Sequence, residues 1–272
     1  MLHSKAAAAA RGGNRILDFI TGAVLFVLFL YGLYMIWYAV MVYRSAFLDD
    51  DLLKFKPSGD SGHNPSLEEL AEINPDVIGW ITIDDTKIDY PVVQGKDNLE
   101  YLDLNVYRDF SLAGTIFLDV SNERDFSDPY NILYGHHMDH GLMFGQVLDF
   151  LEKDFFEEHK TGTLYLLDAT YSVNLFACIE VNAYDSRVLA VNKKPKKMPG
   201  FLSYIKNNAT QYRDIPLKGN DKIIGLVTCE NANTDGRAIL MGRLDRIQKR
   251  SQGEDAEKKR EQKRKKEWYE EE

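Results

Sequence analysis

The longest apolar stretch of the chain lies near its N-terminus and runs from Phe19 to Tyr43 without a charged side chain. At about 1.5 Å of rise per residue, a helix of this length crosses the roughly 30 Å hydrocarbon layer of a bilayer. A cleaved signal peptide has a shorter apolar core followed by small residues, whereas this stretch ends in bulky and aromatic side chains. We therefore predict an uncleaved transmembrane signal anchor at residues 19–43.

The charges on either side of this stretch predict its orientation. Lys5, Arg11 and Arg15 precede it, partly offset by Asp18, and Arg44 and then the acidic run 49–51 follow it. Cationic flanks stay on the cytoplasmic side of a membrane. We therefore expect a single-pass protein of the cell membrane, with residues 1–18 in the cytoplasm and the rest of the chain outside.

Beyond residue 65 the apolar pattern changes to short runs rich in β-branched and aromatic residues. Eight such runs in one domain predict a barrel or a sandwich. They occupy residues 78–83, 87–93, 114–118, 131–134, 163–167, 171–182, 222–228 and 238–244. Helical patterns are expected at 142–159 and 198–208. A capping-box pattern, Ser66 to Glu69, predicts a short helix that ends near Asn74. The fold class is therefore mainly β with flanking helices.

Composition divides the exported part into three segments. Residues 44–65 are predicted to be a linker, because Lys54 to Pro65 are rich in Gly, Ser, Pro and Asp. Residues 66–244 form one domain. Residues 245–272 carry charge blocks of both signs and few aliphatic side chains, which is typical of a disordered tail or a solvated helix.

The net charge limits the classes of molecule that the protein can bind. The chain has 33 Lys and Arg against 42 Asp and Glu, and residues 44–244 alone have 20 against 32. Phosphate neutralisation needs an excess of cations on one surface. This acidic body therefore argues against nucleic acid as a partner.

A cysteine and an arginine lie at the ends of two late β runs. Cys229 directly follows the run IIGLVT, and Arg237 begins the next run after a polar loop. If the two strands are neighbours, the guanidinium lies toward the sulfur, where a cation favours the thiolate and stabilises an oxyanion. Cys178, in the middle of another run, is expected to be a buried packing residue. Two cysteines cannot form a disulfide framework, and we predict that these two stay unpaired.

A thiol nucleophile needs a group that transfers protons, and the histidines offer one. His136 follows the β run NILYG and is therefore expected at another strand end. His136, His137 and His140 together could also form a metal site. The adjoining loop adds only Asp139, so we predict no metal. The residues by themselves support thiol acyl transfer and no finer assignment.

Four segments carry a resemblance to a known family. NPDVIGWITIDDTKIDYPVVQ (74–94), AGTIFLD (113–119), NILYGHHMDHGLMFGQVLDF (131–150) and LVTCENANTDGR (226–237) resemble class B sortases in order and spacing. The predicted helix at 198–208 also fits class B. The chain departs from the family pattern at Gly225, where Thr is usual, and at Val227, where a small polar residue is common. The resemblance covers residues 66–244.

The resemblance implies a membrane-anchored cysteine transpeptidase of Gram-positive bacteria, built on an eight-stranded sortase β-barrel and needing no cofactor. Cys229 would attack the carbonyl after the Thr of a C-terminal sorting motif and form a thioacyl enzyme. His136 would act as general acid and base, and Arg237 would hold the substrate carbonyl. Thr228 would contribute to substrate binding. His137 matches a frequent neighbour of the catalytic histidine and has no catalytic role.

The same resemblance implies the partners. Exported proteins with a C-terminal sorting motif would be the substrates, and the acceptor amine would come from a peptidoglycan precursor or cross-bridge, or from a pilin lysine. The loop expected to select the motif lies around 183–213. Two alternatives stay open from the sequence, namely a thiol hydrolase or peptidase of the cell surface and a non-catalytic anchored scaffold.

Overall fold

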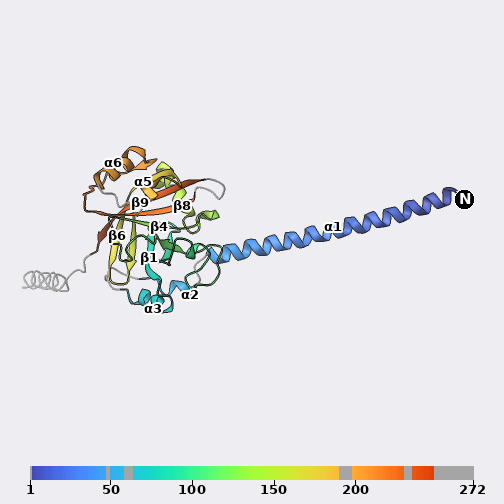
Figure 1. Cartoon of the computed structure of the whole chain (residues 1–272), viewed down its shortest axis with the longest axis horizontal. Helices are drawn as coiled ribbons and strands as arrows, with labels where there is room; N and C mark the ends of the chain where they lie inside the picture. Colours follow the sequence, from blue (N-terminus) through green and yellow to red (C-terminus); the bar gives the residue numbers. More distant parts are fainter. Residues whose placement is uncertain (1, 47–49, 58–63, 190–197, 230–234, 248–272) are drawn as a thin grey trace, which may run out of the picture. The chain divides into compact units, whose positions relative to one another are not determined.

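The computed structural model describes residues 2–46, 50–57, 64–189, 198–229 and 235–247. The chain divides into two compact units, Met1–Phe47 and Leu48–Glu272. The first unit is one helix, α1 (Leu2–Ala46; Figure 1), and its part from Gly13 to Met41 is long and apolar enough to cross a membrane. Its apolar side chains, such as Phe19 and Leu25, are exposed.

The second unit is built on a closed β-barrel. In the order of their pairing, eight strands of the described chain run β5, β1, β2, β3, β4, β8, β9 and β6, and β6 pairs back onto β5. Their bounds are β1 (Val77–Ile83), β2 (Asp89–Val93), β3 (Ile116–Leu118), β4 (Tyr130–Tyr134), β5 (Thr161–Leu166), β6 (Thr170–Asn182), β8 (Lys222–Cys229) and β9 (Gly236–Arg246). Closure removes the exposed sheet edges that would otherwise invite aggregation.

The predicted eight-stranded barrel is therefore confirmed, and each predicted β run overlaps one of its strands. A further strand of two residues, β7 (Gln211–Tyr212), pairs with β6 and was not predicted. It is too short to show a periodic pattern in the sequence. β9 continues to Arg246, two residues into the segment expected to be a tail.

One apolar cluster covers the outer face of β6, β8 and β9. The predicted helix at 198–208 is present as α6 (Met198–Asn208), which lies over these strands with the short helix α5 (Ser186–Leu189; Figure 1). Met198, Phe201 and Ile205 of α6 pack in the same cluster as Val227 and Ile239. Because this outer face is covered, β8 is apolar on both faces, which explains its continuous apolar run.

A second cluster packs around the start of the barrel. α2 (Asp50–Leu53) and α3 (Pro65–Ile73) join β1 there. Leu52 and Phe55, within the segment expected to be a linker, are only 7% and 5% exposed and pack in this cluster with Trp80. Tyr101, on the connection from β2 to β3, also belongs to it.

The helical pattern expected at 142–159 is present only in short pieces. The chain forms the 3-10 helices η2 (Asp139–Gly141) and η3 (Gly145–Leu151), followed by the short helix α4 (Lys153–Glu158). His140 and Gly141 within η2, and Met143 before η3, have φ between 53° and 72°, so η2 is not a regular helix and the helical part of 142–159 begins only at Gly145. The Met143 N–H donates instead to the hydroxyl of Tyr90 on β2. A tertiary contact therefore sets this turn, which side-chain periodicity does not reveal.

The capping box expected at Ser66 is wrong. Helix α3 starts two residues earlier, with Asn64 as its N-cap and Pro65 in its first turn, and the Asn64 side chain makes no capping bond. The Asn64 amide donates to the carbonyl of Leu166 on β5 at 2.6 Å. Asn64 therefore ties the helix start to the barrel, while proline supplies the helical φ that favours initiation.

Candidate active site

The ends of three strands meet at one edge of the barrel. β4 pairs in parallel with β8, with Tyr134 opposite Val227, and the Gly135 N–H donates to the Val227 carbonyl at 3.1 Å. β8 pairs antiparallel with β9, and its last residue, Cys229, lies opposite Arg237. His136 follows β4 by two residues. The fold thus places the backbones of His136, Cys229 and Arg237 at one edge of the barrel, although they are up to 101 positions apart in the sequence.

The His136 imidazole is half-buried and held by one backbone carbonyl. Its Nε2 lies 2.7 Å from the carbonyl oxygen of Leu102. A carbonyl only accepts hydrogen bonds, so this contact requires the proton on Nε2. Nδ1 is then the nitrogen that can take up another proton. The backbone is fixed too, because the His136 carbonyl accepts from the Phe144 N–H at 3.0 Å.

The guanidinium of Arg237 is half-buried, and its Nη1 donates to the carbonyl of Gly236 at 2.8 Å. Its charge acts on Tyr134. Burial, together with Asp119, raises the pKa of Tyr134, and Arg237 opposes that rise. The Tyr134 hydroxyl donates to Asp119 at 3.2 Å.

Tyr134 is a site residue that the sequence pattern did not predict. The available signal was its position at the end of β4, two residues before His136. The action of the Arg237 charge on its phenol is the observation that connects Tyr134 with the site.

The surroundings of the thiol are described only in part. Cys229 is placed by its backbone as the end of β8, while its side chain and residues 230–234 lie outside the described part of the chain. Thr228, opposite Ala238, is 1% exposed, and no described residue bonds to its hydroxyl. Its predicted role in substrate binding stays a prediction.

Cys178 is the buried packing residue that was predicted. It lies within β6, is fully buried and is free. Burial raises the pKa of its thiol far above the ordinary value. A neutral, enclosed thiol is a poor nucleophile, so Cys178 does not compete with Cys229 for the chemistry.

The other histidines of the loop line a cavity beside the site. It has a volume of about 480 Å³, and His137, His140, Asp139 and Lys87 are among its lining residues. In the described ranges no group of three or more His, Cys, Asp or Glu side chains is placed to hold a metal ion. The predicted absence of a metal stays a prediction.

Comparison with known proteins decides the family. The chain is 34% identical over 180 residues to sortase B of Listeria monocytogenes, covering 65% of this chain and 73% of the relative. It is 31% identical over 185 residues to sortase B of Staphylococcus aureus, covering 67% and 76%. The chain belongs to the sortase B family. No family profile matches the sequence.

Solved sortase structures match the barrel as well. A class B sortase of Streptococcus pyogenes involved in pilus biogenesis has a TM-score of 0.61 and 38% identity, covering 65% of this chain and 97% of that one. A S. aureus sortase B–substrate complex has a TM-score of 0.63 and 31% identity, covering 68% and 86%. A sortase B complexed with triglycine has a TM-score of 0.62 and 30% identity, covering 69% and 89%. This sortase is therefore a cysteine transpeptidase.

The structure also explains one departure from the family pattern. Gly225 occupies the place of the usual Thr on β8. A Cβ at this position would lie 2.7 Å from the hydroxyl of Tyr130 and 3.3 Å from Ile239. The large Tyr130 side chain on β4 therefore fills the space that a side chain at position 225 would need.

Proposed function

We propose that this sortase cleaves a C-terminal sorting motif after its Thr and transfers the new carboxyl end to an amine. The Cys229 thiolate attacks the carbonyl carbon, the C–N bond breaks, and the leaving amine takes a proton from His136. The acceptor amine then attacks the thioester and gives a proton to the His136 imidazole, and the C–S bond breaks to restore the Cys229 thiolate and the His136 imidazolium. Arg237 stabilises the negative oxygen in both steps.

The observation that carries this proposal is the shared edge of β4, β8 and β9. Parallel pairing of β4 with β8 puts His136 beside the end of β8, and antiparallel pairing puts Arg237 opposite Cys229. A nucleophile, a proton carrier and a cation are the three groups that acyl transfer requires. The Nε2–H tautomer of His136 leaves Nδ1 for the proton transfers.

The acceptor we propose is an amine of a cell-wall peptide. The relative complexed with triglycine supports it, because that ligand ends in a primary amine. The relative solved with a substrate supports a peptide donor. A second acceptor, a pilin lysine, is favoured by the 38% identity to the streptococcal sortase involved in pilus biogenesis. The two acceptors share the chemistry and differ in the amine that is captured.

We also propose that α1 anchors the enzyme with its N-terminus in the cytoplasm and the barrel outside the cell. The span Gly13–Met41 has the required length and composition. Lys5, Arg11 and Arg15 lie before it or in its first turn, against Arg44 alone just after it. This orientation places the barrel on the side of the membrane where exported substrates and wall precursors are found.

The test is a ligation assay with the full chain in detergent micelles. The donors are a library of sorting-motif peptides, and the acceptors are triglycine and a lysine-containing pilin peptide. We expect ligated product with a preference for triglycine, and no product from Cys229→Ala or His136→Ala. Hydrolysed peptide alone, in the presence of both amines, would indicate a thiol hydrolase. Undiminished activity of Cys229→Ala would refute the assignment of the nucleophile.

A further inference from the structure

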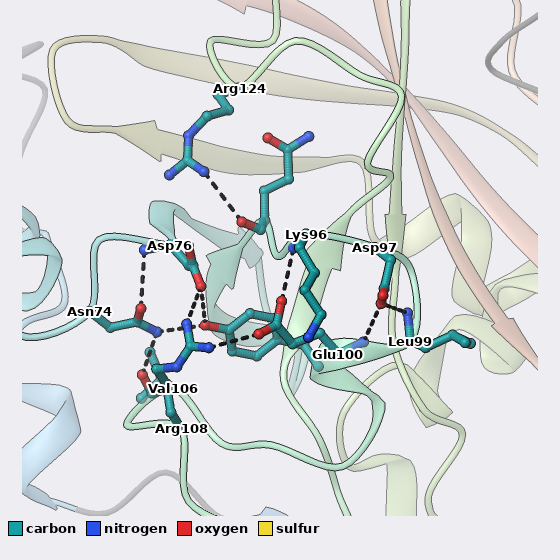
Figure 2. A network of polar contacts seen from close by, with 11 residues as sticks. Asn74, Asp76, Lys96, Asp97, Leu99, Glu100, Val106, Arg108 and Arg124 are labelled. Atoms are coloured by element: carbon teal, nitrogen blue, oxygen red, sulfur yellow. Dashed lines mark hydrogen bonds and ion pairs between the residues drawn. The ribbon is translucent and has the colours of Figure 1, made fainter.

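The carbonyl that contacts His136 belongs to a segment held by a network of polar contacts (Figure 2). Leu102 is the last residue of the 3-10 helix η1 (Glu100–Leu102), on the long connection between β2 and β3. Such connections are usually the mobile parts of a fold. This one must nevertheless present a carbonyl oxygen to an imidazole at hydrogen-bonding distance.

Tyr101 anchors the middle of η1. Its side chain is 1% exposed, its hydroxyl donates to Asp76 at 2.8 Å, and it accepts from the Asn74 amide at 2.9 Å. Burial raises the pKa of Tyr101 to about 12, so the phenol keeps the proton that it donates. Asp76 lies directly before β1, and its carbonyl accepts from the Gln94 N–H at the end of β2. The anchor therefore reaches the barrel itself.

Arg108 closes the network from the other side. Its Nη1 pairs with Asp76 at 2.5 Å and its Nη2 pairs with Glu100 at 2.7 Å. Figure 2 shows the guanidinium between the two carboxylates. The second carboxylate oxygen of Glu100 accepts from the Lys96 N–H at 2.8 Å. The first residue of η1 is thus fixed through both of its oxygens.

The backbone of Arg108 is in a conformation that normally selects glycine. Its φ is +68°, at the end of a tight loop in which the Asn105 N–H donates to the Asp109 carbonyl and the Arg108 N–H donates to that of Asn105. Glycine is usual at such a position, because a Cβ is strained there. The local backbone therefore disfavours arginine at position 108. The ion pairs of the Arg108 side chain with Asp76 and Glu100 offset this backbone strain.

Gly114 lies close against the Leu102 carbonyl. Its φ is +61°, and a Cβ on it would lie 2.6 Å from the carbonyl oxygen of Leu102. The Thr115 N–H donates to the carbonyl of Tyr101 at 3.0 Å. The chain before β3 therefore packs tightly against the end of η1, and the Leu102 carbonyl has little room to move.

We propose that Arg108 is a positioning residue for transpeptidation: by joining Glu100 to Asp76 it fixes the Leu102 carbonyl against His136 and holds the imidazole as the Nε2–H tautomer. This inference rests on the proposed role of His136 as the proton carrier. Arg108 does not contact the reacting atoms. Its effect is on the orientation of the imidazole and on which nitrogen is left to accept a proton.

Two variants and a matched control test the proposal in the full chain in detergent micelles. Arg108→Gly removes the guanidinium and supplies the residue type that suits φ +68°. Arg108→Lys keeps one cation without the two-pronged contact. Arg124→Gln is the control, because Arg124 donates to the carbonyls of Pro75 and Gln94 beside Asp76 and lies outside the Arg108 contacts (Figure 2).

The first readout is the tautomer of His136, from long-range ¹⁵N–¹H spectra of histidine-labelled protein. His136→Gln assigns the signal. We expect the Nε2–H form in the unchanged enzyme and in Arg124→Gln, and both tautomers in Arg108→Gly. The second readout is kinetic, and we expect kcat of Arg108→Gly to fall about tenfold with KM changed less than about twofold. The kcat of Arg108→Lys should lie between that of the unchanged enzyme and that of Arg108→Gly.

Stability separates positioning from folding. Arg108→Gly relieves a strained backbone while it removes ion pairs of an arginine side chain that is 47% exposed, so its Tm should stay within about 3 °C of the unchanged enzyme. If the Tm of Arg108→Gly falls further, Glu100→Gln replaces it as the test variant. This substitution removes the charge that pairs with Arg108 and keeps a side chain of similar shape. The proposal is overturned if the variant used, Arg108→Gly or Glu100→Gln, keeps a pure Nε2–H tautomer of His136 and an unchanged kcat. If the proposal on Arg108 fails in this way while His136→Ala is inactive, the proposed function still holds. An active His136→Ala would refute the proposed function itself.

Discussion

The backbone of Cys229 pairs directly with that of Arg237 across the antiparallel β8–β9 ladder. Eight positions separate the two residues in the sequence, and the register of the ladder places them side by side. A cation beside the end of β8 stabilises both a thiolate and the oxyanion of a tetrahedral intermediate. The site therefore depends on the register of one strand pair.

Replacement of Arg237 tests this relationship. We expect Arg237→Ala to lower kcat for motif cleavage by about 10²- to 10³-fold, because one oxyanion donor is lost. Arg237→Lys should recover part of the loss, since it keeps the charge. The control is Arg243→Gln, six residues further along β9, whose guanidinium pairs with Asp245. Comparable loss in both variants would mean that Arg237 only supports the strand.

The two thiols should differ in reactivity. Cys178 is fully buried and its thiol pKa is raised by burial, so it should not react in the folded enzyme. Iodoacetamide under mildly alkaline conditions should add one group to the native chain, at Cys229, and two groups after unfolding in guanidinium. Peptide mass spectrometry locates the adducts. A native adduct on Cys178 would contradict the enclosed position of this residue.

Gly225 and Tyr130 should be coupled in stability. Gly225→Ala puts a Cβ 2.7 Å from the Tyr130 hydroxyl and should lower the free energy of unfolding by about 1–3 kcal/mol. No described residue bonds to that buried hydroxyl, so Tyr130→Phe should be neutral or stabilising by about 1 kcal/mol. The double variant should lose less than the sum of the single changes. Urea melts give the four values, and strict additivity would exclude the steric contact.

Stability should fall in alkali. Burial raises the pKa values of Tyr90, Tyr101, Tyr130 and Tyr134 above the ordinary value of 10.0, that of Tyr101 to about 12. Above about pH 10 the unfolded chain releases phenol protons that the folded chain keeps. The unfolded state then binds fewer protons, and stability decreases as pH rises, by about 1.4 kcal/mol per pH unit for each residue.

Urea melts between about pH 9 and pH 11 measure this slope. Tyr130→Phe is the matched variant, because it removes one of the four titrating groups and keeps the ring in the core. In this variant the free energy of unfolding should decrease less steeply with pH, by the contribution of one tyrosine. An identical slope in the variant and in the unchanged enzyme would show that Tyr130 ionises alike in the folded and unfolded states.

Local pattern predicted most of the barrel. Each of the eight strands and helix α6 lies where the apolar periodicity placed it, because strand alternation and helical spacing are local properties of the chain. The helical pattern expected at 142–159 begins only after Met143, whose N–H donates to the hydroxyl of Tyr90. The cap expected at Ser66 failed because Asn64 is fixed by a carbonyl of β5. Both differences from the predicted pattern lie where a distant strand determines the local backbone.

The sequence by itself determined the N-terminal apolar helix, the eight strands and the three candidate residues near strand ends, since each follows from the pattern of neighbouring positions. Only the tertiary structure decided that these strand ends share one edge, because strand order and register depend on closing the barrel around a common core. It also decided the surroundings of His136. The Leu102 carbonyl and the Arg108 contacts come from a connection that carries no periodic signal, and its geometry is set by packing against the barrel.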